Sequence, residues 1–397
     1  MNETDVIIAG AGIAGLSLAA LLSQRGLRVV VVDGAPHPDR LGPLGAGVND
    51  WDRRVSALTP ASSALLTDIG AWAAIVEKRS AAYDSMRVWD AEGTGAVAFT
   101  AFEVGAPDLG HIVENRITVD ALLGVLEREK TVALRWNDPI IAVNNHHTAG
   151  VQVTTEDGDR MTAPLLVGAD GAKSIVREQL GFRVRQWSYE QSAIVATIAL
   201  EQHHNARCYQ AFLATGPLAL LPLADPLLCS IVWSLDTSAV DAVRALTDAD
   251  FVLALNRALG DQAPPVAKVG ARAMFPLQQC HAVDYVQPRV ALVADAAHAI
   301  HPLAGQGINL GLADVGVLAD EVEQATSAQV DWGDLAVLRR YQRRRKTENL
   351  ATMAAMEGFK RGFGSGNPAL RVLRNAGLSW VNHRSHIKRW LTMQALS

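Results

Sequence analysis

The chain has 397 residues, of which 49% are hydrophobic and 19% are charged. This composition excludes a disordered, collagen-like or disulfide-stapled protein, and the length predicts two or three domains. Cys208, Cys229 and Cys280 form no CxxC or CxxxxC pair, so a zinc knuckle and dithiol redox chemistry lack their ligands. No basic leader opens the chain, and its longest uncharged stretch, 208–224, is broken by glycine and proline. We therefore expect a cytoplasmic protein without a membrane span.

Two short apolar runs and an intervening helix predict a βαβ unit at the start of the chain. Residues 5–9 and 27–32 have the character of strands buried on both faces, and residues 13–25 have helical spacing that ends at Gly26. Between the first strand and the helix stands a GxGxxG turn, which consists of Gly10, Ala11, Gly12, Ile13, Ala14 and Gly15.

This turn has the composition of a phosphate-binding loop. Its first glycine permits the tight turn, its second lets the backbone approach a pyrophosphate, and its third allows close packing of helix on strand. The helix N-terminus presents free N–H groups to the phosphates. Asp33, at the end of the second strand, can accept hydrogen bonds from both ribose hydroxyls, and an acid there disfavours a 2′-phosphate. The unit therefore predicts FAD or NAD in preference to NADP.

The rest of the chain alternates between segments typical of a nucleotide-binding domain and a β-rich insertion. In chain order we expect a loop at 36–50, a helix at 62–79, strands at 83–104, a helix at 118–130, strands to 168, strand-like runs at 186–236, and a strand, glycine-rich turn and helix at 290–319. The expected domains are a nucleotide-binding domain in three pieces (1–82, 105–182 and 281–335), a substrate domain in two (83–104 and 183–280) and a helical C-terminal region (336–397).

Two further motifs follow apolar strands. The run 165–177 carries Asp170 and, taken alone, is a strand that ends in a turn. The run 290–311 delivers Asp295, whose carboxylate is placed to bind a sugar-alcohol hydroxyl. Its Gly-Gln-Gly turn at 305–307 opens a helix whose dipole can face an anionic ring. The run 290–311 therefore extends the predicted cofactor site.

Two other features bear on ligands and partners. His298 and His301 lack a third ligand with suitable spacing, so we expect no metal site.

From Arg339 onward, 13 Lys and Arg residues are opposed by only two acids, Glu348 and Glu357. Such a region suits an anionic surface, either a membrane or an acidic protein, or else forms a solvated helix face. No interleaved aromatic residues or reading motif accompany it, so nucleic acid is not an expected partner.

The three motifs, in this order and spacing, resemble the FAD-dependent aromatic hydroxylases with one nucleotide-binding domain, the class A flavoprotein monooxygenases. Segments similar to the ubiquinone-biosynthesis hydroxylases (the UbiH, UbiF, VisC/UbiI and Coq6 group) are 52–58, 109–116 and 302–309. Segments most like the VisC/UbiI type, the 2-polyprenylphenol hydroxylase, are 86–90, 193–198, 221–226, 228–235 and 338–341. The resemblance implies an α/β fold. Its FAD domain is of the glutathione-reductase type, with a parallel sheet and three layers (ββα). The other parts are an inserted mixed-sheet α+β substrate domain and a helical C-terminal region.

The same resemblance implies roles for individual residues. Positions that match the cofactor-binding motifs are Gly10, Ala11, Gly12, Ile13, Ala14, Gly15, Asp33, Arg54, Arg116, Asp170, Asp295, Gly305, Gln306, Gly307, Ile308 and Asn309. Arg54 and Arg116 are implied to contact the phosphates or ribityl chain, and Asp170 to serve both FAD and the nicotinamide donor. The loop that contains Pro302, Gly305, Gln306 and Gly307 is the candidate catalytic segment beside the flavin. Two positions depart from the family: Asp33 stands where Glu is usual, and Ala294 stands where Gly is usual.

The implied reaction is hydroxylation of the ring of a polyprenylphenol-type lipid in ubiquinone biosynthesis, with bound FAD, NADH or NADPH as transient donor, and O2. Residues 211–223 could line a tunnel for the prenyl tail, although a plain buried strand explains most of these positions. Implied partners are a membrane surface, contacted through the basic C-terminal region, and a ubiquinone-biosynthesis complex. Three alternatives stay open: a soluble aromatic substrate, a later ubiquinone intermediate, and a non-catalytic flavoprotein subunit.

Overall fold

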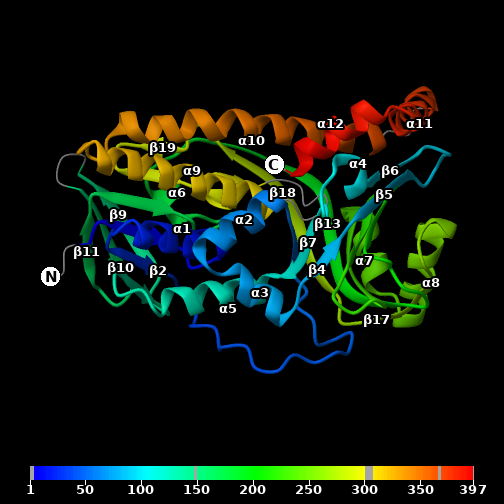
Figure 1. Cartoon of the computed structure of the whole chain (residues 1–397), viewed down its shortest axis with the longest axis horizontal. Coiled ribbons are helices and arrows are strands. Elements are labelled where there is room, and N and C mark those ends of the chain that lie inside the picture. Colours follow the sequence, from blue (N-terminus) through cyan, green and yellow to red (C-terminus); the bar gives the residue numbers. More distant parts are fainter. Residues whose placement is uncertain (1–3, 147–149, 300–306, 365–367, 397) are drawn as a thin grey trace.

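A parallel sheet forms the centre of the first structural unit in the computed structural model, which describes residues 4–146, 150–299, 307–364 and 368–396 (Figure 1). Neighbouring strands of this sheet are parallel except for the β19–β20 pair. In spatial order the strands are β19 (Val286–Gln287), β20 (Val290–Leu292), β12 (Leu165–Gly168), β1 (Val6–Ala9), β2 (Val29–Val32) and β8 (Val132–Arg135).

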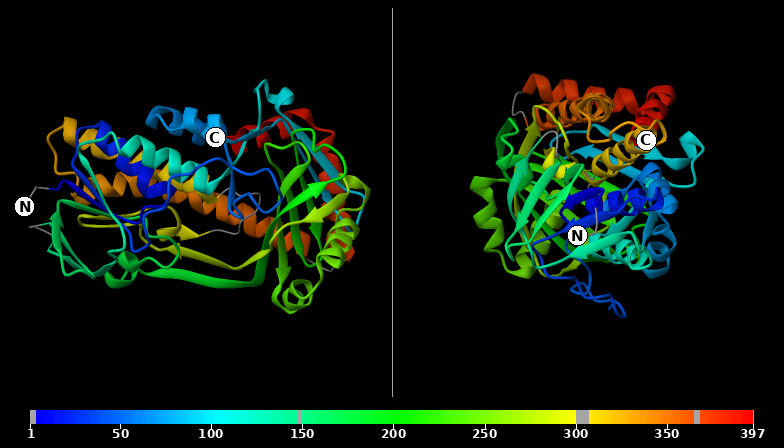
Figure 2. Two further views of the ribbon diagram at one scale, coloured as in Figure 1. Left: turned by 90° about the horizontal axis from the view of Figure 1, so that it is seen from below. Right: turned by 90° about the vertical axis from the view of Figure 1, so that its left-hand side faces the viewer.

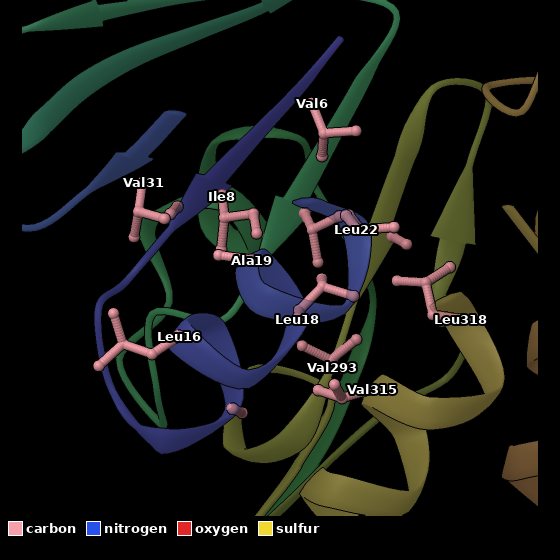
Figure 3. Close-up of a cluster of buried hydrophobic side chains, with 14 of the residues drawn as sticks. Val6, Ile8, Leu16, Leu18, Ala19, Leu22, Val31, Val293, Val315 and Leu318 are labelled. Carbon is pink, nitrogen blue, oxygen red and sulfur yellow. The ribbon is translucent and has the colours of Figure 1, made fainter. Parts of the chain in front are cut away.

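Helices and a second sheet cover the two faces of this parallel sheet. One face carries α1 (Ile13–Gln24), α5 (Asn115–Leu126) and α9 (Gly307–Ser327). An antiparallel sheet of β9 (Ile140–Asn145), β10 (Val151–Thr155) and β11 (Arg160–Ala163) packs on the other face, and α6 (Ile175–Gln179) follows β12. Buried aliphatic side chains of β1, α1 and α9, including Ile8, Leu18 and Val315, fill the space between the layers (Figure 3). These three layers confirm the predicted fold class of the FAD domain.

A nine-stranded mixed sheet forms the second unit. Its strands are β21 (His298–Ala299), β18 (Ala273–Ala282), β13 (Val184–Leu200), β16 (Leu228–Asp236), β15 (Gly216–Pro222), β14 (Arg207–Leu213), β5 (Ser85–Asp90) and β6 (Ala96–Thr100), with β17 (Val266–Val269) beside β13. Helices α7 (Thr237–Arg244) and α8 (Asp248–Leu259) cover one face (Figure 2). The β14–β5 pair is parallel and the others are antiparallel, which agrees with the predicted mixed sheet.

Smaller elements join the two units. A three-stranded sheet consists of β3 (Val55–Leu58), β7 (Gly110–Glu114) and β4 (Ala81–Tyr83), and α2 (Pro60–Ile69) and α3 (Trp72–Lys78) lie near it, whereas α4 (Ala101–Val104) follows β6. Short 3-10 turns are η1 (Gly260–Gln262) and η2 (Ala294–Ala296). Helix α10 (Leu335–Gly364) lies along α9, and α11 (Pro368–Asn382) and α12 (Ser385–Leu396) pack against β6 and α4 (Figure 1). Among the described residues, no helix is both long enough and apolar enough to cross a membrane.

The structure corrects several predicted boundaries. The single helix expected at 62–79 is two helices, because Gly70 adopts a left-handed conformation with φ +88° and ends α2. The helix expected at 118–130 begins at Asn115 and ends at Leu126. The strands expected to continue to 104 end at Thr100, where the Thr100 and Glu103 side chains form a capping box that starts α4.

Candidate active site

The GxGxxG turn shows a different spatial constraint at each glycine. Gly10 has φ +102°, and a Cβ there would lie 2.4 Å from the carbonyl oxygen of Ala169, next to Asp170. A Cβ on Gly15 would lie 2.0 Å from the carbonyl oxygen of Gly10, so helix α1 can pack on β1 only with glycine there. A Cβ on Gly12 would meet nothing within 4 Å. The first and third glycines therefore serve the fold, and the second faces open space.

The first and second motifs line one cleft of about 420 Å³. Its walls include Gly10, Gly12, Asp33, Asp170 and Gly171. One Asp33 oxygen accepts a hydrogen bond from the N–H of Ala11 at 2.6 Å, which fixes the carboxylate at the end of β2 beside the turn. Asp33 and Asp170 are 137 positions apart in the sequence, and β1 and β12 bring the first and second motifs together as neighbouring parallel strands.

The two oxygens of the Asp170 carboxylate differ in their hydrogen bonding to the described part of the protein. One oxygen accepts hydrogen bonds from the N–H groups of Ile175 and Val176 at 2.8 and 3.2 Å. The other is buried without a partner in the described part of the chain, and burial raises the pKa of this carboxyl. Helix α1 has no side-chain cap at Gly12, so its first N–H groups are also free of side-chain partners. A dinucleotide can form hydrogen bonds with this Asp170 oxygen and with these N–H groups. The cleft therefore fits FAD.

Asp295 and Arg54 lie near each other at the next part of the site. Asp295 follows β20 in the η2 turn, and its side chain is solvent-accessible. Surrounding protein raises the pKa of its carboxyl, while the charges of His298 and Arg54 act in the opposite direction. Arg54 forms no ion pair with any described residue. Both side chains are thus available for the ribityl and phosphate roles that the family resemblance implies.

Arg116 differs from Arg54 because its guanidinium is already held by protein groups. It donates to the buried carboxylate of Glu114 at 2.8 Å and to the carbonyl oxygen of Asp50 at 2.5 Å. Glu114 also pairs with Arg79, whose guanidinium lies 3.6 Å from the ring centroid of Trp51. The geometry therefore gives Arg116 a structural role in fastening the loop before β3. A cofactor contact by Arg116 stays a prediction.

The third motif is only partly visible in the described residues. Pro302, Gly305, Gln306 and His301 lie outside them, and α9 is described from Gly307 and Ile308 onward. The Asn309 side chain forms three hydrogen bonds within the protein: its amide nitrogen donates to the carbonyl of Ala57 at 2.8 Å, and its oxygen accepts from the Thr59 N–H at 3.1 Å and the Ser62 hydroxyl at 2.7 Å. It therefore fixes the first turn of α9 against β3 and α2, a role that the sequence did not reveal.

A buried ionic network lies beneath the third motif. One oxygen of the fully buried Asp314 accepts from the Ala294 N–H at 3.0 Å and lies 2.5 Å from Nε2 of His298. The other accepts from Arg345 at 2.9 Å and from Asn349 at 3.1 Å. Burial alone would raise the pKa of Asp314, but His298 and Arg345 lower it overall. Sequence reasoning missed this network, although an Asp within the apolar face of α9 was a signal.

An apolar cavity of about 130 Å³ lies beside the first turn of α9. The residues that line it are Ala57, Thr59, Tyr83, Met86, Phe99, Leu109, Cys208, Tyr209, Gln210, Ala219, Leu221, Leu391, Thr392 and Leu396. Ala57 and Thr59 are the residues that Asn309 holds, which joins the cavity wall to the third motif. Of the run 211–223, Ala219 and Leu221 line this cavity, in keeping with the expectation that a plain buried strand explains most of these positions.

Six of the 13 basic residues of the C-terminal region form ion pairs with described acids of the protein. Its ion pairs are Arg340 and Arg344 with Glu321, Arg345 with Asp314, Arg371 with Glu92, Arg374 with Asp90, and Lys388 with Glu103. Part of the positive charge of this segment therefore offsets acids elsewhere in the chain. Among its described residues, the exposed cations without an ion pair include Arg384 and Arg389.

The FAD binding domain family matches residues 3–355 of this chain. The chain belongs to this family. Its relatives include 3-demethoxyubiquinol 3-hydroxylase of Escherichia coli K12, 36% identical over 395 residues that cover 100% of this chain and 99% of that protein. Ubiquinone biosynthesis monooxygenase COQ6 of Xenopus tropicalis is 34% identical, over 97% of this chain and 91% of that protein. Ubiquinone hydroxylase UbiL of Rhodospirillum rubrum is 36% identical, over 99% of this chain and 89% of that protein.

Solved structures show the same fold. PqsL of Pseudomonas aeruginosa superposes with a TM-score of 0.79 at 24% identity, over 95% of this chain and 99% of that one. The p-nitrophenol 4-monooxygenase PnpA of Pseudomonas putida superposes with a TM-score of 0.78 at 19% identity, over 100% of this chain and 98% of that one. The family and its relatives confirm an FAD-dependent monooxygenase of the UbiH/Coq6 group, with NAD(P)H and O2 as the co-substrates typical of the class. They do not single out the VisC/UbiI type.

Proposed function

We propose that this monooxygenase hydroxylates the aromatic ring of a polyprenylphenol-type lipid in ubiquinone biosynthesis. The observation that carries the proposal is the apolar cavity beside α9. None of the described residues that line it bears a charge at neutral pH, since burial raises the pKa of the Tyr83 and Cys208 side chains. A carboxylated aromatic would need a cationic partner in such a place, because an unpaired buried charge is strongly unfavourable. The cavity therefore favours a neutral phenol or quinol over a soluble benzoate.

Different residues of the site would bind the cofactor, exclude water and position the substrate ring. Gly12, Asp33 and the N-terminus of α1 would hold the ADP part of FAD, and Asp295 with Arg54 the ribityl and phosphate region. When bound and reduced by NADH or NADPH, FAD activates O2 for transfer of one oxygen atom to the ring. The apolar walls of the cavity exclude water during this step. Asn309 keeps the ring-binding wall at Ala57 and Thr59 in fixed register with α9.

Two ring substrates within the pathway are candidates for this enzyme. The VisC/UbiI-like segments favour a 2-polyprenylphenol, whereas the name of the Escherichia coli relative indicates a later intermediate, 3-demethoxyubiquinol. The test is anaerobic stopped-flow reduction of the holoenzyme by NADH and NADPH with a short-chain 2-prenylphenol, a short-chain demethoxyubiquinol or 4-hydroxybenzoate. Faster flavin bleaching with one of the two prenylated rings, and a hydroxylated product after oxygenation, is expected. Acceleration by 4-hydroxybenzoate alone would overturn the proposal.

We also propose that α11 and α12 contact an anionic membrane surface. Helix α11 directs a charged side chain inward and apolar side chains outward. Arg374 pairs with Asp90, whereas Val372 and Leu373 are 70% and 71% exposed. On α12, Leu391, Thr392 and Leu396 face the cavity, and Trp390 and Met393 lie on the outer face at 61% and 54% exposure.

The charges of this surface support the same partner. Residues 358–397 contain no acid, and Arg384 and Arg389 are exposed beside the outer apolar side chains. Exposed apolar side chains, tryptophans and unpaired arginines together suit the headgroup region of an anionic bilayer. Because α12 separates the cavity from this outer face, a lipid substrate could reach the cavity from the bilayer past this helix. Membership of a ubiquinone-biosynthesis complex stays a prediction.

A further inference from the structure

Two polar side chains stand out in the apolar cavity, Gln210 of β14 and Tyr83 of β4. Gln210 is 5% exposed and points to the same face of the mixed sheet as Cys208, because side chains two apart on a strand share a face. Neither the Gln210 amide nor the Tyr83 hydroxyl hydrogen-bonds to another described residue. A buried amide without partners is unfavourable, so it requires either ordered water or a ligand group.

We propose that Gln210 and Tyr83 bind the oxygen substituents of the substrate ring, both of them contacting the single hydroxyl of a 2-prenylphenol, and so determine which ring the enzyme accepts. This inference rests on the proposed function. The Gln210 amide can both donate and accept, so it can bind a phenol hydroxyl, a methoxy oxygen or a quinol oxygen. The Tyr83 hydroxyl stays protonated at physiological pH, because burial raises its pKa, and it can therefore donate to a ring oxygen.

The size and position of the cavity agree with a ring whose oxygen lies between these two groups. Its volume of about 130 Å³ is close to that of a protein cavity of roughly 150 Å³ that is known to hold benzene. Tyr83 belongs to the small β3–β7–β4 sheet and Gln210 to the nine-stranded sheet, so they come from different walls. A polyprenyl tail does not fit in this volume and would leave the cavity past Leu391 and Leu396 of α12.

The test measures the binding of two ligands to each of two variants. Gln210→Met removes the amide and keeps the length of the side chain, and Tyr83→Phe removes only the hydroxyl. Each holoenzyme is titrated with 2-prenylphenol and with prenylbenzene, which lacks the ring oxygen, and binding is followed by the flavin absorbance. Gln278→Met, an exposed position on β18 outside the cavity, is the matched control.

We expect Gln210→Met to weaken 2-prenylphenol binding by about 10-fold to 100-fold and Tyr83→Phe by about 10-fold, with prenylbenzene affinity unchanged or improved. A merely structural role would weaken both ligands together and lower the melting temperature. If the wild-type enzyme binds and hydroxylates 2-prenylphenol but both variants keep its preference over prenylbenzene, the inference is wrong. If the wild-type enzyme binds neither prenylphenol nor a demethoxyubiquinol, the proposed function itself fails.

Discussion

Asp314 and Arg345 form a buried ion pair, 2.9 Å apart, between α9 and α10. The Asp314 side chain is fully buried and the Arg345 side chain is 5% exposed, so neither charge can be solvated if its partner is removed. Through its second oxygen Asp314 also holds the Ala294 N–H and His298, which flank Asp295. One carboxylate thus links the packing of two long helices to the geometry of the third cofactor motif.

We expect Asp314→Asn to destabilise the protein by about 3 kcal/mol, because it leaves the buried Arg345 with only the exposed carboxylate of Glu348 as counter-charge. The pKa of Asp314 is lower in the folded protein than in the unfolded chain. Its contribution is therefore fully present above the unfolded pKa of about 3.9 and is lost as the pH falls through the folded pKa. Denaturant melts of both proteins should differ by a constant amount above about pH 5 and converge in more acid buffer. A difference that grows as the pH falls would contradict this assignment.

Ala294 and Gly311 are coupled by steric contact. Ala294 has φ +53°, a left-handed conformation that glycine adopts more easily, and a Cβ on Gly311 would lie 2.7 Å from the Ala294 Cβ. We expect Gly311→Ala to lower the free energy of unfolding by about 1 to 3 kcal/mol. The double variant Ala294→Gly, Gly311→Ala should recover most of that loss, because it removes the opposing methyl group. Additive effects of the two substitutions in thermal melts would show that the contact is not responsible.

Two glycines of the first motif should separate cofactor binding from folding. Gly12→Ala meets nothing in the protein, so the apoprotein should melt within about 1 kcal/mol of the wild type. The new methyl group would nevertheless occupy the space expected for the pyrophosphate and weaken FAD binding by at least about 10-fold. Gly15→Ala collides with the carbonyl of Gly10 and should destabilise the apoprotein itself. Apoprotein melts and fluorescence titration with FAD measure both effects. Unchanged FAD affinity in Gly12→Ala would place the pyrophosphate elsewhere.

The local motifs could be predicted from the sequence, but most of their tertiary partners could not. The turn at Gly10 and the acid at Asp33 follow from strand and helix patterns with fixed short spacing. The break at Gly70 follows from its left-handed conformation, which a helical pattern in the surrounding residues concealed. The contact between Asn309 and Ala57 joins residues 252 positions apart, and no local preference encodes such a pairing.

The ion pairs of the C-terminal region are a second example of tertiary contacts that the sequence does not predict. A count of 13 basic residues against two acids predicts an open cationic face, but a count does not show which acids the fold brings near. Arg374 pairs with Asp90 and Lys388 with Glu103, both more than 280 positions away. What distinguishes the surface is the small set of exposed arginines beside exposed apolar residues. These residues, and not the total charge, are the ones to test against a membrane.

The membrane proposal predicts that binding depends on the outer face of α12 and on anionic lipid. Sedimentation with vesicles of phosphatidylcholine and phosphatidylglycerol should show binding that falls with salt and is weak for phosphatidylcholine alone. Arg384→Gln with Arg389→Gln should lower the partition coefficient by about 10-fold or more, since each arginine near such a surface contributes about 1 kcal/mol. Trp390→Ala with Met393→Ser should weaken binding to both lipid mixtures, because it removes apolar insertion.

The matched control is Leu253→Ser, which removes an apolar side chain of 52% exposure from α8, on the far side of the mixed sheet. It should leave vesicle binding unchanged. Flavin content and hydroxylation of a water-soluble short-chain phenol should also be unchanged in the Arg384 and Arg389 double variant, since neither residue lines the cavity. Equal binding of all variants, or binding indifferent to phosphatidylglycerol, would contradict the membrane proposal.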